Sequence, residues 1–367
     1  MSDLRIQKLA HILVDHSTRI QPGDRVYIEA TTEALALVEA LYETVLQRGG
    51  HPYPHLHLPW QDELFFKYAN TDQLAHKPIF RGLAYAEFES RIRIHSLANT
   101  NALNHVDASK QATWNATNAH ILETQMRRGA AKELKWVTTL FPTQAYAQQA
   151  SMGLKEYEDF VYCAAFAHED DPIASWSKVK ADQQRIVDSL VGHDIVTLHG
   201  PNVDLSLSIK DRTFINASGE NNMPDGEIYT GPVENSLEGW VRYTYPSIRG
   251  GRVVEGIELK FENGRVAQAS ATKNQDFLFK QLDIDEGARY VGEFAIGTNF
   301  AIQQFTGNIL FDEKIGGTFH MALGAGYPET GSQNKSVIHW DMICDMRTDA
   351  EIRVDGELIY KDGSFTI

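Results

Sequence analysis

The chain has 367 residues, which is too long for one ordinary domain and fits two. Hydrophobic residues make up 43% and charged residues 23%, the composition of a soluble globular protein. The formal net charge of −15 argues against nucleic acid or an anionic membrane as a partner.

The cysteines and the N-terminal sequence predict a cytoplasmic protein. Cys163 and Cys344 lie in different halves and neither belongs to a CxxC motif, which favours a reducing compartment. Residues 1–20 have an amphipathic helical pattern with charges throughout, unlike a signal peptide. No run approaches the roughly 18 apolar residues of a membrane span, so no membrane partner is expected.

The first half of the chain predicts an α/β domain with a mainly parallel sheet. A strand at 25–29, a helix at 33–48 and a strand at 51–58 form a β-α-β order, which is typical of parallel sheets. Gly49 and Gly50 end the helix between the two strands. Further helices are expected at 3–16, 62–69, 71–79, 106–128, 143–152, 156–166 and 170–192, and further strands at 88–96 and 133–142.

The second half has short segments in which polar and apolar residues alternate, with turn signals every few residues, and it predicts a β-rich α+β domain. ENGR (262–265) and DGEL (355–358) predict hairpin turns. One helix is expected at about 274–283. We therefore predict an α/β domain over 1–192 and a β-rich domain over 193–367.

Several common functional motifs are absent from the sequence. The first predicted strand is followed by EATTEALAL, which contains no glycine, and the chain has neither a GxGxxG nor a Walker motif. The absence of these loops excludes dinucleotide and P-loop nucleotide binding. The GxSxG motif of a nucleophile elbow is also absent.

Most histidines have an ordinary structural explanation. His51, His55 and His57 lie in HPYPHLHL without an acidic partner nearby, so we interpret them as the polar end of a strand. Surface or core positions are expected for the histidines scattered through helices and turns, His11, His16, His76, His95, His105, His120, His168, His193 and His199.

Four motifs in the second half carry potential metal ligands. They are MPDGEIYTGP (223–232) with Glu227, RYVGEFAIGTN (289–299) with Glu293, GTFHMALGAGY (317–327) with His320 and Tyr327, and VIHWD (337–341) with His339 and Asp341. His339 and Asp341 have i, i+2 spacing, which places both on one face of a strand and Trp340 on the other. Spacing alone leaves two explanations open. The residues form a metal site, or they have separate structural roles: Glu227 and Glu293 as exposed strand carboxylates, His320 as a core histidine, and His339 with Asp341 as an ion pair.

These four motifs, in this order, resemble the M29 family of metallo-aminopeptidases, of the thermophilic aminopeptidase and aminopeptidase S type. The resemblance extends to QPGDRVYIEAT near the N-terminus and to the segment from IELKFENGRV to GEFAIG, so it covers most of the chain. It implies that Glu227, Glu293, His320, His339 and Asp341 hold two divalent metal ions per chain. Zinc, cobalt, manganese and magnesium all suit such mixed ligands.

The resemblance also implies a reaction. Water activated by the two ions attacks the scissile carbonyl of a short peptide and releases its N-terminal residue. We expect Glu293 to carry the proton to the leaving amine, and Tyr327 to donate a hydrogen bond to the oxyanion. A homodimer is implied as well. Lys314, Arg249 and Asn299 flank the motifs and are more readily explained as structural residues than as substrate contacts.

Two other functions are compatible with the same residues. A single Fe(II) held by two histidines and a carboxylate would suit a ring-opening dioxygenase of the hydroxypyridine type, whose second domain resembles this family. The retention of all five ligands argues for two metals instead. The third possibility is a binding protein that keeps the fold and a metal without catalysis, and the presence of Tyr327 and both glutamates argues against it.

Overall fold

In the computed structural model, which describes residues 3–367, the chain forms two units. Unit 1 contains the described residues up to Trp176 together with Gly219–Pro224, and unit 2 contains Ser177–Ser218 and Asp225–Ile367. The chain therefore leaves unit 1, returns to it for a short segment, and leaves it again. The domain boundary at residue 192 stays a prediction.

Unit 1 is built on a five-stranded sheet in which every pair of neighbouring strands is parallel. In sheet order the strands are β2 (His51–His57), β1 (Arg25–Thr31), β3 (Ser90–His95), β4 (Lys135–Leu140) and β8 (Asn222–Met223). The last of these is the segment that returns from later in the chain. The predicted parallel sheet of the first half is confirmed.

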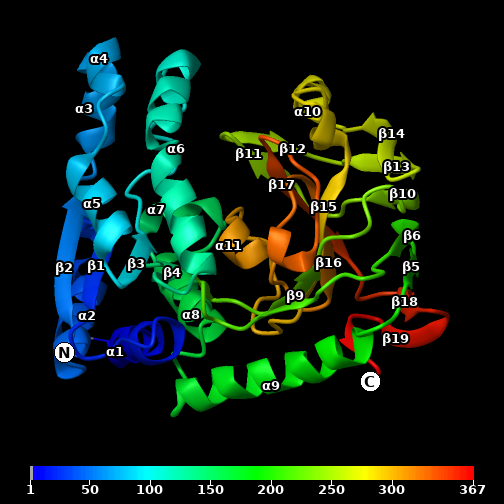
Figure 1. Ribbon diagram of the computed structural model, residues 1–367, viewed down its shortest axis with the longest axis horizontal. Helices are drawn as coiled ribbons and strands as arrows, with labels where there is room; N and C mark the ends of the chain where they lie inside the picture. Colours follow the sequence, from blue (N-terminus) through cyan, green and yellow to red (C-terminus); the bar gives the residue numbers. More distant parts are fainter. Residues whose placement is uncertain (1–2) are drawn as a thin grey trace. The chain divides into compact units, whose positions relative to one another are not determined.

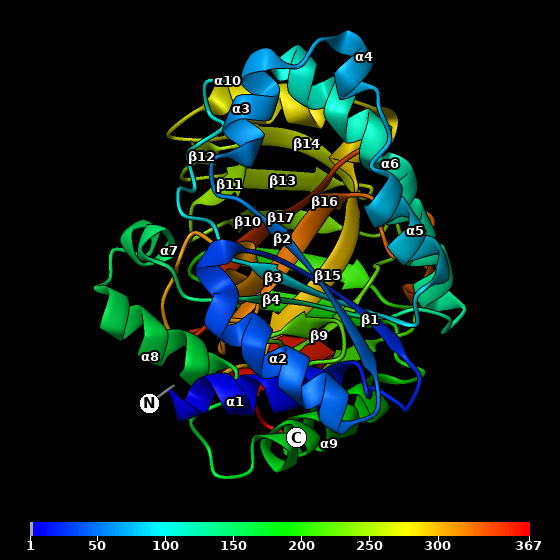
Figure 2. The same cartoon turned by 90° about the vertical axis from the view of Figure 1, so that its left-hand side faces the viewer.

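The helices of unit 1 cover this sheet (Figures 1 and 2). They are α1 (Leu4–His11), η1 (Ile12–Ser17), η2 (Thr32–Ala34), α2 (Leu35–Gln47), α3 (Gln61–Tyr68), α4 (Thr71–Leu74), α5 (Ile79–Glu87), α6 (Ala108–Ala130), α7 (Gln144–Gln149) and α8 (Leu154–Ala164). Because β2 and β3 lie on opposite sides of β1, right-handed connections carry α2 to one face and α5 and α6 to the other. Tyr27 of β1 packs on that second face with Tyr85 of α5 and Ile121 of α6.

One predicted helix in unit 1 is wrong in its extent. The sequence predicts a helix throughout 71–79, but α4 ends at Leu74 and a new helix, α5, begins at Ile79. Pro78 stands directly before α5, and a proline restricts the preceding residue to extended conformations. The helix α9 (Pro172–Leu190) matches the long helix expected at 170–192.

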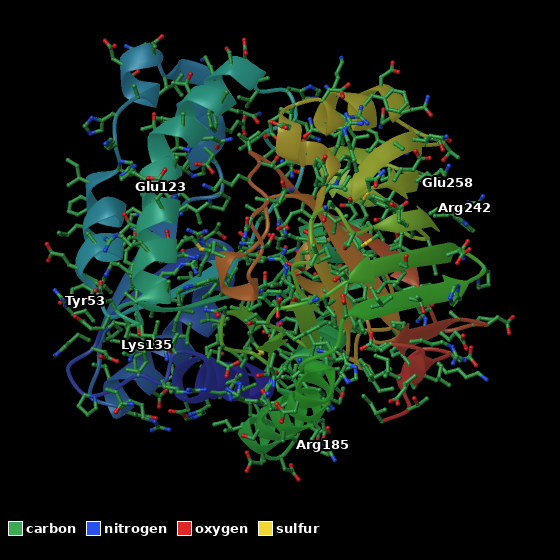
Figure 3. All side chains as sticks on the ribbon, turned by 45° about the vertical axis from the view of Figure 1, so that its right-hand side comes forward. Tyr53, Glu123, Lys135, Arg185, Arg242 and Glu258 are labelled. Carbon is green, nitrogen blue, oxygen red and sulfur yellow. The ribbon has the colours of Figure 1, made fainter. Side chains whose placement is uncertain are left out.

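Unit 2 contains two larger antiparallel sheets. The first has eight strands, in the order β14 (Arg265–Ser270), β13 (Glu258–Glu262), β10 (Glu238–Arg242), β6 (Val203–Ser208), β5 (Ile195–Gly200), β18 (Glu351–Val354), β19 (Glu357–Lys361) and β20 (Ser364–Phe365). Arg242 of β10 and Glu258 of β13, labelled in Figure 3, form an ion pair of 2.9 Å between neighbouring strands of this sheet.

The second sheet has five strands and carries the candidate site. Its order is β17 (His339–Asp345), β16 (Thr318–Gly324), β15 (Val291–Gly297), β9 (Glu227–Thr230) and β7 (Ile215–Ala217), and Figure 1 shows β15, β16 and β17 side by side. Unit 2 also contains the hairpin of β11 (Ser247–Arg249) and β12 (Arg252–Val254), the helices α10 (Gln275–Leu282) and α11 (Ile309–Asp312), and the short 3-10 helices η3 (Glu286–Arg289) and η4 (Pro328–Thr330).

The two large sheets of unit 2 share one apolar core. Leu198, Leu205 and Val241 of the eight-stranded sheet belong to the same cluster of buried side chains as Phe294 and Met321 of the five-stranded sheet. Each sheet therefore buries one apolar face, as packed antiparallel sheets do. The other face of the five-stranded sheet is free to carry polar side chains.

Both predicted hairpin turns are confirmed. Asn263 and Gly264 connect β13 to β14, and Asp355 and Gly356 connect β18 to β19. All four residues have positive φ, as a two-residue turn between right-twisted antiparallel strands requires.

Candidate metal centre

The five predicted ligands lie on four neighbouring strands of one sheet. Glu227 opens β9, Glu293 lies in β15, His320 lies in β16, and His339 and Asp341 lie in β17. Registered partners in an antiparallel sheet share a face, and side chains alternate along each strand.

The register places all five side chains on the same face. Glu227 pairs with Gly297 of β15. Glu293 lies four residues before Gly297 in the same strand, so both residues are on the same face. His320 pairs with Ala295, and Asp341 pairs with Ala322. Most residues opposite these ligands are glycine or alanine, including Gly324 opposite His339, and Ile343, the second partner of His320, is the exception. The small side chains leave room above the sheet.

The alternate residues of the same strands point into the apolar core. Phe294, Phe319, Met321, Trp340 and Met342 are all members of the buried cluster of unit 2. The sequence prediction that Trp340 faces away from His339 and Asp341 is consistent with this packing. Alternation of apolar and polar residues thus fixes which face of the sheet receives the ligands.

His320 is the centre of the buried part of the cluster. Its side chain has no exposed surface, and its Nε2 atom lies 3.1 Å from Glu293 Oε1 and 3.3 Å from Glu227 Oε2. Burial lowers the pKa of His320, but the hydrogen bond to Glu293 and the charges of Glu227 and Glu293 outweigh it and raise the pKa to about 9.

His339 and Asp341 form the more accessible part of the cluster. His339 Nε2 lies 3.5 Å from Asp341 Oδ1 and 3.9 Å from Glu293 Oε2, and the imidazole remains 28% exposed. Its other nitrogen, Nδ1, donates to the carbonyl oxygen of Ala325 at 2.8 Å, which orients Nε2 toward the carboxylates. This second hydrogen bond is the arrangement usual for a histidine that binds a metal.

The charges of this pair support each other. Burial lowers the pKa of His339, but the charge of Asp341 raises it to about 10. Burial raises the pKa of Asp341, but the charge of His339 outweighs it, so the pKa falls below its ordinary value. Without a metal ion, protons on the imidazoles balance the carboxylates, and a bound cation would displace them.

Tyr327 lies beside the same side chains. Its ring centroid is 5.2 Å from that of His339 and 5.5 Å from that of Tyr229. Burial and the charges of Glu293 and Asp341 raise the pKa of the Tyr327 phenol well above its ordinary value. The hydroxyl therefore keeps its proton and is available as a hydrogen-bond donor.

Glu313 is a further candidate ligand that the sequence analysis missed. It follows α11 directly, and its carboxylate lies close to His320 and Asp341. Burial raises the pKa of Glu313 above its ordinary value, although the charge of Lys314 acts in the opposite direction. The only sequence signal was an acidic pair, FDEK, just before the His320 motif.

Among residues 3–367, three trios of side chains offer metal-ligand atoms within 4.8 Å of one another. We name them the Glu227 trio (Glu227, Glu293, His320), the His339 trio (Glu293, His339, Asp341) and the Glu313 trio (Glu313, His320, Asp341). All five ligands predicted from the sequence belong to at least one trio.

The donor atoms of the cluster fit a divalent cation. Glu227 Oε2 and Asp341 Oδ1 are buried and accept no hydrogen bond from any residue in the described range 3–367. A buried carboxylate oxygen without a hydrogen bond is costly unless a cation compensates it. Mixed carboxylate and imidazole donors suit zinc, manganese and cobalt.

The three flanking residues have structural contacts. Arg249 donates from Nη1 to the carbonyl oxygen of His339 and from Nε to Gln281, both at 2.9 Å. Asn299 donates to the carbonyl oxygen of Asp225 at 2.8 Å. Lys314 is fully buried among the carboxylates, and its contacts are described below.

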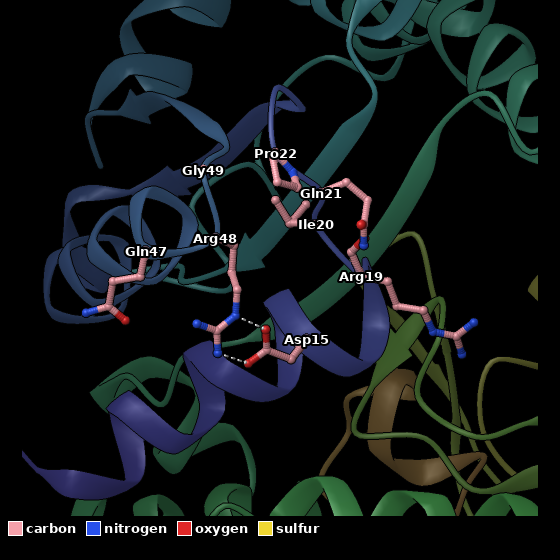
Figure 4. A pocket seen from close by; sticks show the side chains of 8 residues that line it. All are labelled: Asp15, Arg19, Ile20, Gln21, Pro22, Gln47, Arg48 and Gly49. Carbon is pink, nitrogen blue, oxygen red and sulfur yellow. Dashed lines mark hydrogen bonds and ion pairs between the residues drawn. The ribbon is translucent and has the colours of Figure 1, made fainter.

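Other candidate places contain no comparable cluster. His51, His55 and His57 lie on β2, an edge strand that also contains two prolines, and in residues 3–367 none of the three belongs to a metal-ligand trio. A surface hollow of about 740 Å³ in unit 1 is shown in Figure 4. There Arg48 donates to Asp15 through hydrogen bonds of 2.6 and 2.8 Å, so these two opposite charges already satisfy each other.

In the part of the chain that the structure describes, no helix has the length and apolar character needed to cross a membrane.

Comparison with known proteins assigns the whole chain to one group. The model of the Peptidase_M29 family, described as thermophilic metalloprotease (M29), matches residues 2–365. Aminopeptidase 2 of Geobacillus stearothermophilus is 29% identical to the chain, over 98% of this chain and 94% of the relative.

Solved structures show the same fold. AmpT from Thermus thermophilus superposes with a TM-score of 0.88 at 22% identity and covers 99% of both chains. The 2,5-dihydroxypyridine dioxygenase of Pseudomonas putida KT2440 has a TM-score of 0.59 at 13% identity, over 99% of this chain and 96% of that protein. The predicted fold class, an α/β region followed by a β-rich region, is confirmed.

Proposed function

The chain belongs to the M29 family of thermophilic metalloproteases, and from that premise we propose that it is an aminopeptidase acting on short peptides. Family membership makes it a metal-dependent peptidase. The similarity to Aminopeptidase 2, which extends over nearly the whole of both chains, supports removal of residues from the peptide N-terminus.

The observation that carries the proposal is the convergence of six side chains at one sheet face. Glu227, Glu293, His320, His339 and Asp341 come from four strands, and Glu313 joins them from the end of α11. Such a set of carboxylates and imidazoles supplies the ligands of a hydrolytic metal centre.

We assign these six residues as the metal ligands. A divalent ion held there would polarise the scissile carbonyl and lower the pKa of a water molecule, as in other metal-dependent hydrolases. Zinc, cobalt, manganese and magnesium are the candidate ions, and two ions per chain are proposed for the fully loaded enzyme. Three overlapping trios are enough to hold two ions.

The remaining steps fall to side chains of the chain itself. Glu293 directs both carboxylate oxygens into the cluster, one toward His320 and one toward His339, and we propose that it passes a proton to the leaving amine. Tyr327 is protonated and lies beside His339, and its hydroxyl would donate to the oxyanion of the substrate.

The proposal also includes the oligomeric state and the cellular location. We infer a homodimer from the family resemblance and a cytoplasmic location from the cysteine usage, and both stay predictions. Chromatography with light scattering would test the dimer.

The alternative function is a ring-opening dioxygenase with a single iron, and it predicts a different experimental result. The likeness to the 2,5-dihydroxypyridine dioxygenase concerns the fold, and the carboxylates of Glu227 and Glu293 favour hydrolysis over a site of two histidines and one carboxylate. A dioxygenase would bind one iron and consume oxygen.

Hydrolysis of aminoacyl-p-nitroanilides tests the proposal. We expect release of nitroaniline that a chelator abolishes and that zinc, cobalt or manganese restores. A panel of aminoacyl substrates and short peptides that stays intact with each of these metals would overturn the aminopeptidase assignment. Oxygen uptake with added Fe(II) and hydroxypyridines would then identify the alternative.

A further inference from the structure

A lysine side chain lies inside the metal centre. Lys314 has no exposed surface, and its Nζ atom lies 2.8 Å from Glu227 Oε1 and 3.8 Å from Asp225 Oδ1. It also forms a hydrogen-bonded ion pair with Glu313. An ammonium group has three N–H donors and no acceptor, so it satisfies these carboxylates as a small cation would.

The backbone of Lys314 is held in place on both sides. Its amide donates to the carbonyl oxygen of Phe311 at 3.0 Å, and its carbonyl accepts from the amide of Asn299 at 3.1 Å. The residue therefore cannot shift outward without breaking the connection between α11 and the segment after β15. Only a rotation of the side chain would take Nζ away from the carboxylates.

Lys314 divides the three trios into two kinds. It binds Glu227, a member of the Glu227 trio, and Glu313, a member of the Glu313 trio. Among the residues of the described chain, it forms no ion pair with any member of the His339 trio. Among the described residues, the His339 trio is therefore the one of the three in which no carboxylate is paired with Lys314.

We propose that Lys314 competes with the metal for this centre, so that the two ion positions differ in affinity. The His339 trio fills first, and an ion at the Glu227 or Glu313 trio binds more weakly as long as Lys314 holds its carboxylates. The inference rests on the proposed metal centre, but it requires no peptide hydrolysis.

Two effects weaken metal binding at the Glu227 and Glu313 trios: repulsion between the ion and the ammonium of Lys314, and the loss of ligand oxygens to hydrogen bonds with Lys314. An ion in the Glu227 or Glu313 trio would stand close to a buried ammonium, and two cations repel strongly where water is excluded. Glu227 Oε1 and the Glu313 oxygen that bind Lys314 are also unavailable as ligands until the ammonium leaves, whereas Glu227 Oε2 accepts no hydrogen bond from a described residue. No oxygen of the His339 trio binds Lys314, so an ion there meets only the longer-range repulsion of the ammonium, and the trio keeps one side accessible through the partly exposed His339.

The consequence is graded loading of the enzyme. At low metal concentration the chain would hold one ion, and the second would enter only at higher concentration. Lys314 would thus set the metal concentration at which the fully loaded enzyme forms.

Metal binding by the whole chain tests this inference. Metal-free protein is dialysed against a series of Zn²⁺ or Mn²⁺ concentrations, and the ions per chain are counted by elemental analysis for wild type, Lys314→Met and Lys314→Gln. Over a range of concentrations, we expect wild type to hold one ion where both variants hold two, because the second affinity rises at least about tenfold without the ammonium.

Lys273→Met is the matched control, since Lys273 forms an exposed ion pair with Glu255 in the same unit. Its loading should follow that of wild type. Circular dichroism establishes that each variant is folded, and Lys314→Gln, which keeps hydrogen-bond donors, serves if the methionine variant is not. Identical loading curves for wild type and the Lys314 variants would overturn the inference.

The outcome is separable from that of the proposed function. Unequal loading that Lys314→Met abolishes, in a protein that cleaves no peptide, would support the role of Lys314 and contradict the aminopeptidase proposal. Equal loading of an active enzyme would do the reverse.

Discussion

At the scale of single residues, His339 connects the buried and the accessible parts of the centre. Its Nδ1 atom is committed to Ala325, so its Nε2 atom is the only nitrogen left for a metal or a proton. It also belongs to the trio that contains no partner of Lys314. We therefore expect the first metal ion to depend on this residue more than on Glu227 or Glu313.

Substitution of His339 by alanine should remove metal and activity while the fold remains. The imidazole is partly exposed, so its loss leaves no closed cavity in the core. Hydrolysis should fall by at least about a hundredfold, since even an outer partner of a metal ligand contributes about 10–100-fold. Elemental analysis and peptide assays measure the effect.

His199→Ala is the control for this substitution. His199 of β5 forms an exposed pair with Asp204 at 2.8 Å, which is a similar His–Asp contact outside the cluster. Its loss should leave metal content and hydrolysis unchanged. Full activity in the His339 variant would show that the ligand assignment is wrong.

Tyr327→Phe isolates the hydroxyl group from the ring. The contacts of the ring with His339 and Tyr229 remain, so any loss reports the hydrogen bond alone. If the hydroxyl binds the oxyanion, kcat should fall by about a hundredfold or more, with little change in KM. Tyr290→Phe in the same unit is the control, and equal kinetics of the two variants would exclude the role of Tyr327.

At the scale of elements, the two hairpin turns of unit 2 differ in the space around their glycines. Gly264 and Gly356 both have positive φ, at +79° and +87°. A Cβ atom on Gly264 would lie 1.9 Å from the carbonyl oxygen of Glu234, whereas one on Gly356 would have no atom within 4 Å. The same substitution therefore separates backbone strain from a steric clash.

Alanine at each position gives a quantitative prediction. Gly356→Ala should lower the free energy of unfolding by about 1–2 kcal/mol, the cost of a left-handed conformation. Gly264→Ala should cost at least about 2 kcal/mol more, because backbone atoms must also move. Urea or thermal unfolding followed by circular dichroism measures both, and equal losses would contradict this packing of the β13–β14 turn.

The elements also explain which parts of the centre could be predicted from the sequence. The five ligands predicted from the sequence lie on strands in which apolar residues alternate with them. This local pattern predicts that the ligand side chains point away from the apolar core. They are Glu227, Glu293, His320, His339 and Asp341. Their order and spacing carried the family resemblance. The turns at Asn263–Gly264 and Asp355–Gly356 were predictable for a similar reason, since only a few residue types accept positive φ.

The parts that were missed depend on contacts between distant segments. Glu313 and Lys314 reach the centre because the chain after β15 folds back, where the Asn299 amide binds the Lys314 carbonyl. No periodicity in FDEK records that contact. The helix α5 was missed because its pattern follows closely after Pro78, where the preceding helical signal was extended too far.

At the scale of the whole molecule, unit 1 contains its own buried charge cluster. The carboxylate of Glu29 in β1 is buried, accepts a hydrogen bond of 2.6 Å from the Tyr85 hydroxyl, and forms ion pairs with three arginines. They are Arg81 at 2.8 Å, Arg91 at 3.4 Å and Arg93 at 3.2 Å. The cluster joins two neighbouring strands of the parallel sheet to α5.

This cluster predicts a loss of stability in acid. Burial raises the pKa of Glu29, but the arginine charges and the Tyr85 hydroxyl outweigh it and lower the pKa from 4.5 to about 2. Because the folded pKa is the lower one, the contribution is complete above about pH 4.5 and is lost as the pH falls through about 2. Its size is about 3 kcal/mol.

Glu29→Gln tests the pH dependence. The amide cannot balance three arginines, so the variant should be less stable than wild type by about 3–5 kcal/mol near neutral pH. The difference in Tm between the two proteins should narrow as the pH falls from about 5 to about 2. Glu39→Gln, an exposed position on α2, is the control, and a constant difference across this range would contradict the assigned pKa.

The two units thus differ in their buried charges: an ion cluster joins strands of the parallel sheet in unit 1 to α5, and unit 2 contains the candidate metal centre. The central claim concerns the second of these, and anomalous X-ray diffraction from zinc- or manganese-loaded crystals tests it most directly. We predict an anomalous peak within about 2.0–2.3 Å of ligand atoms of Glu293, His339 and Asp341. Strong peaks elsewhere, with none at these three residues, would contradict it.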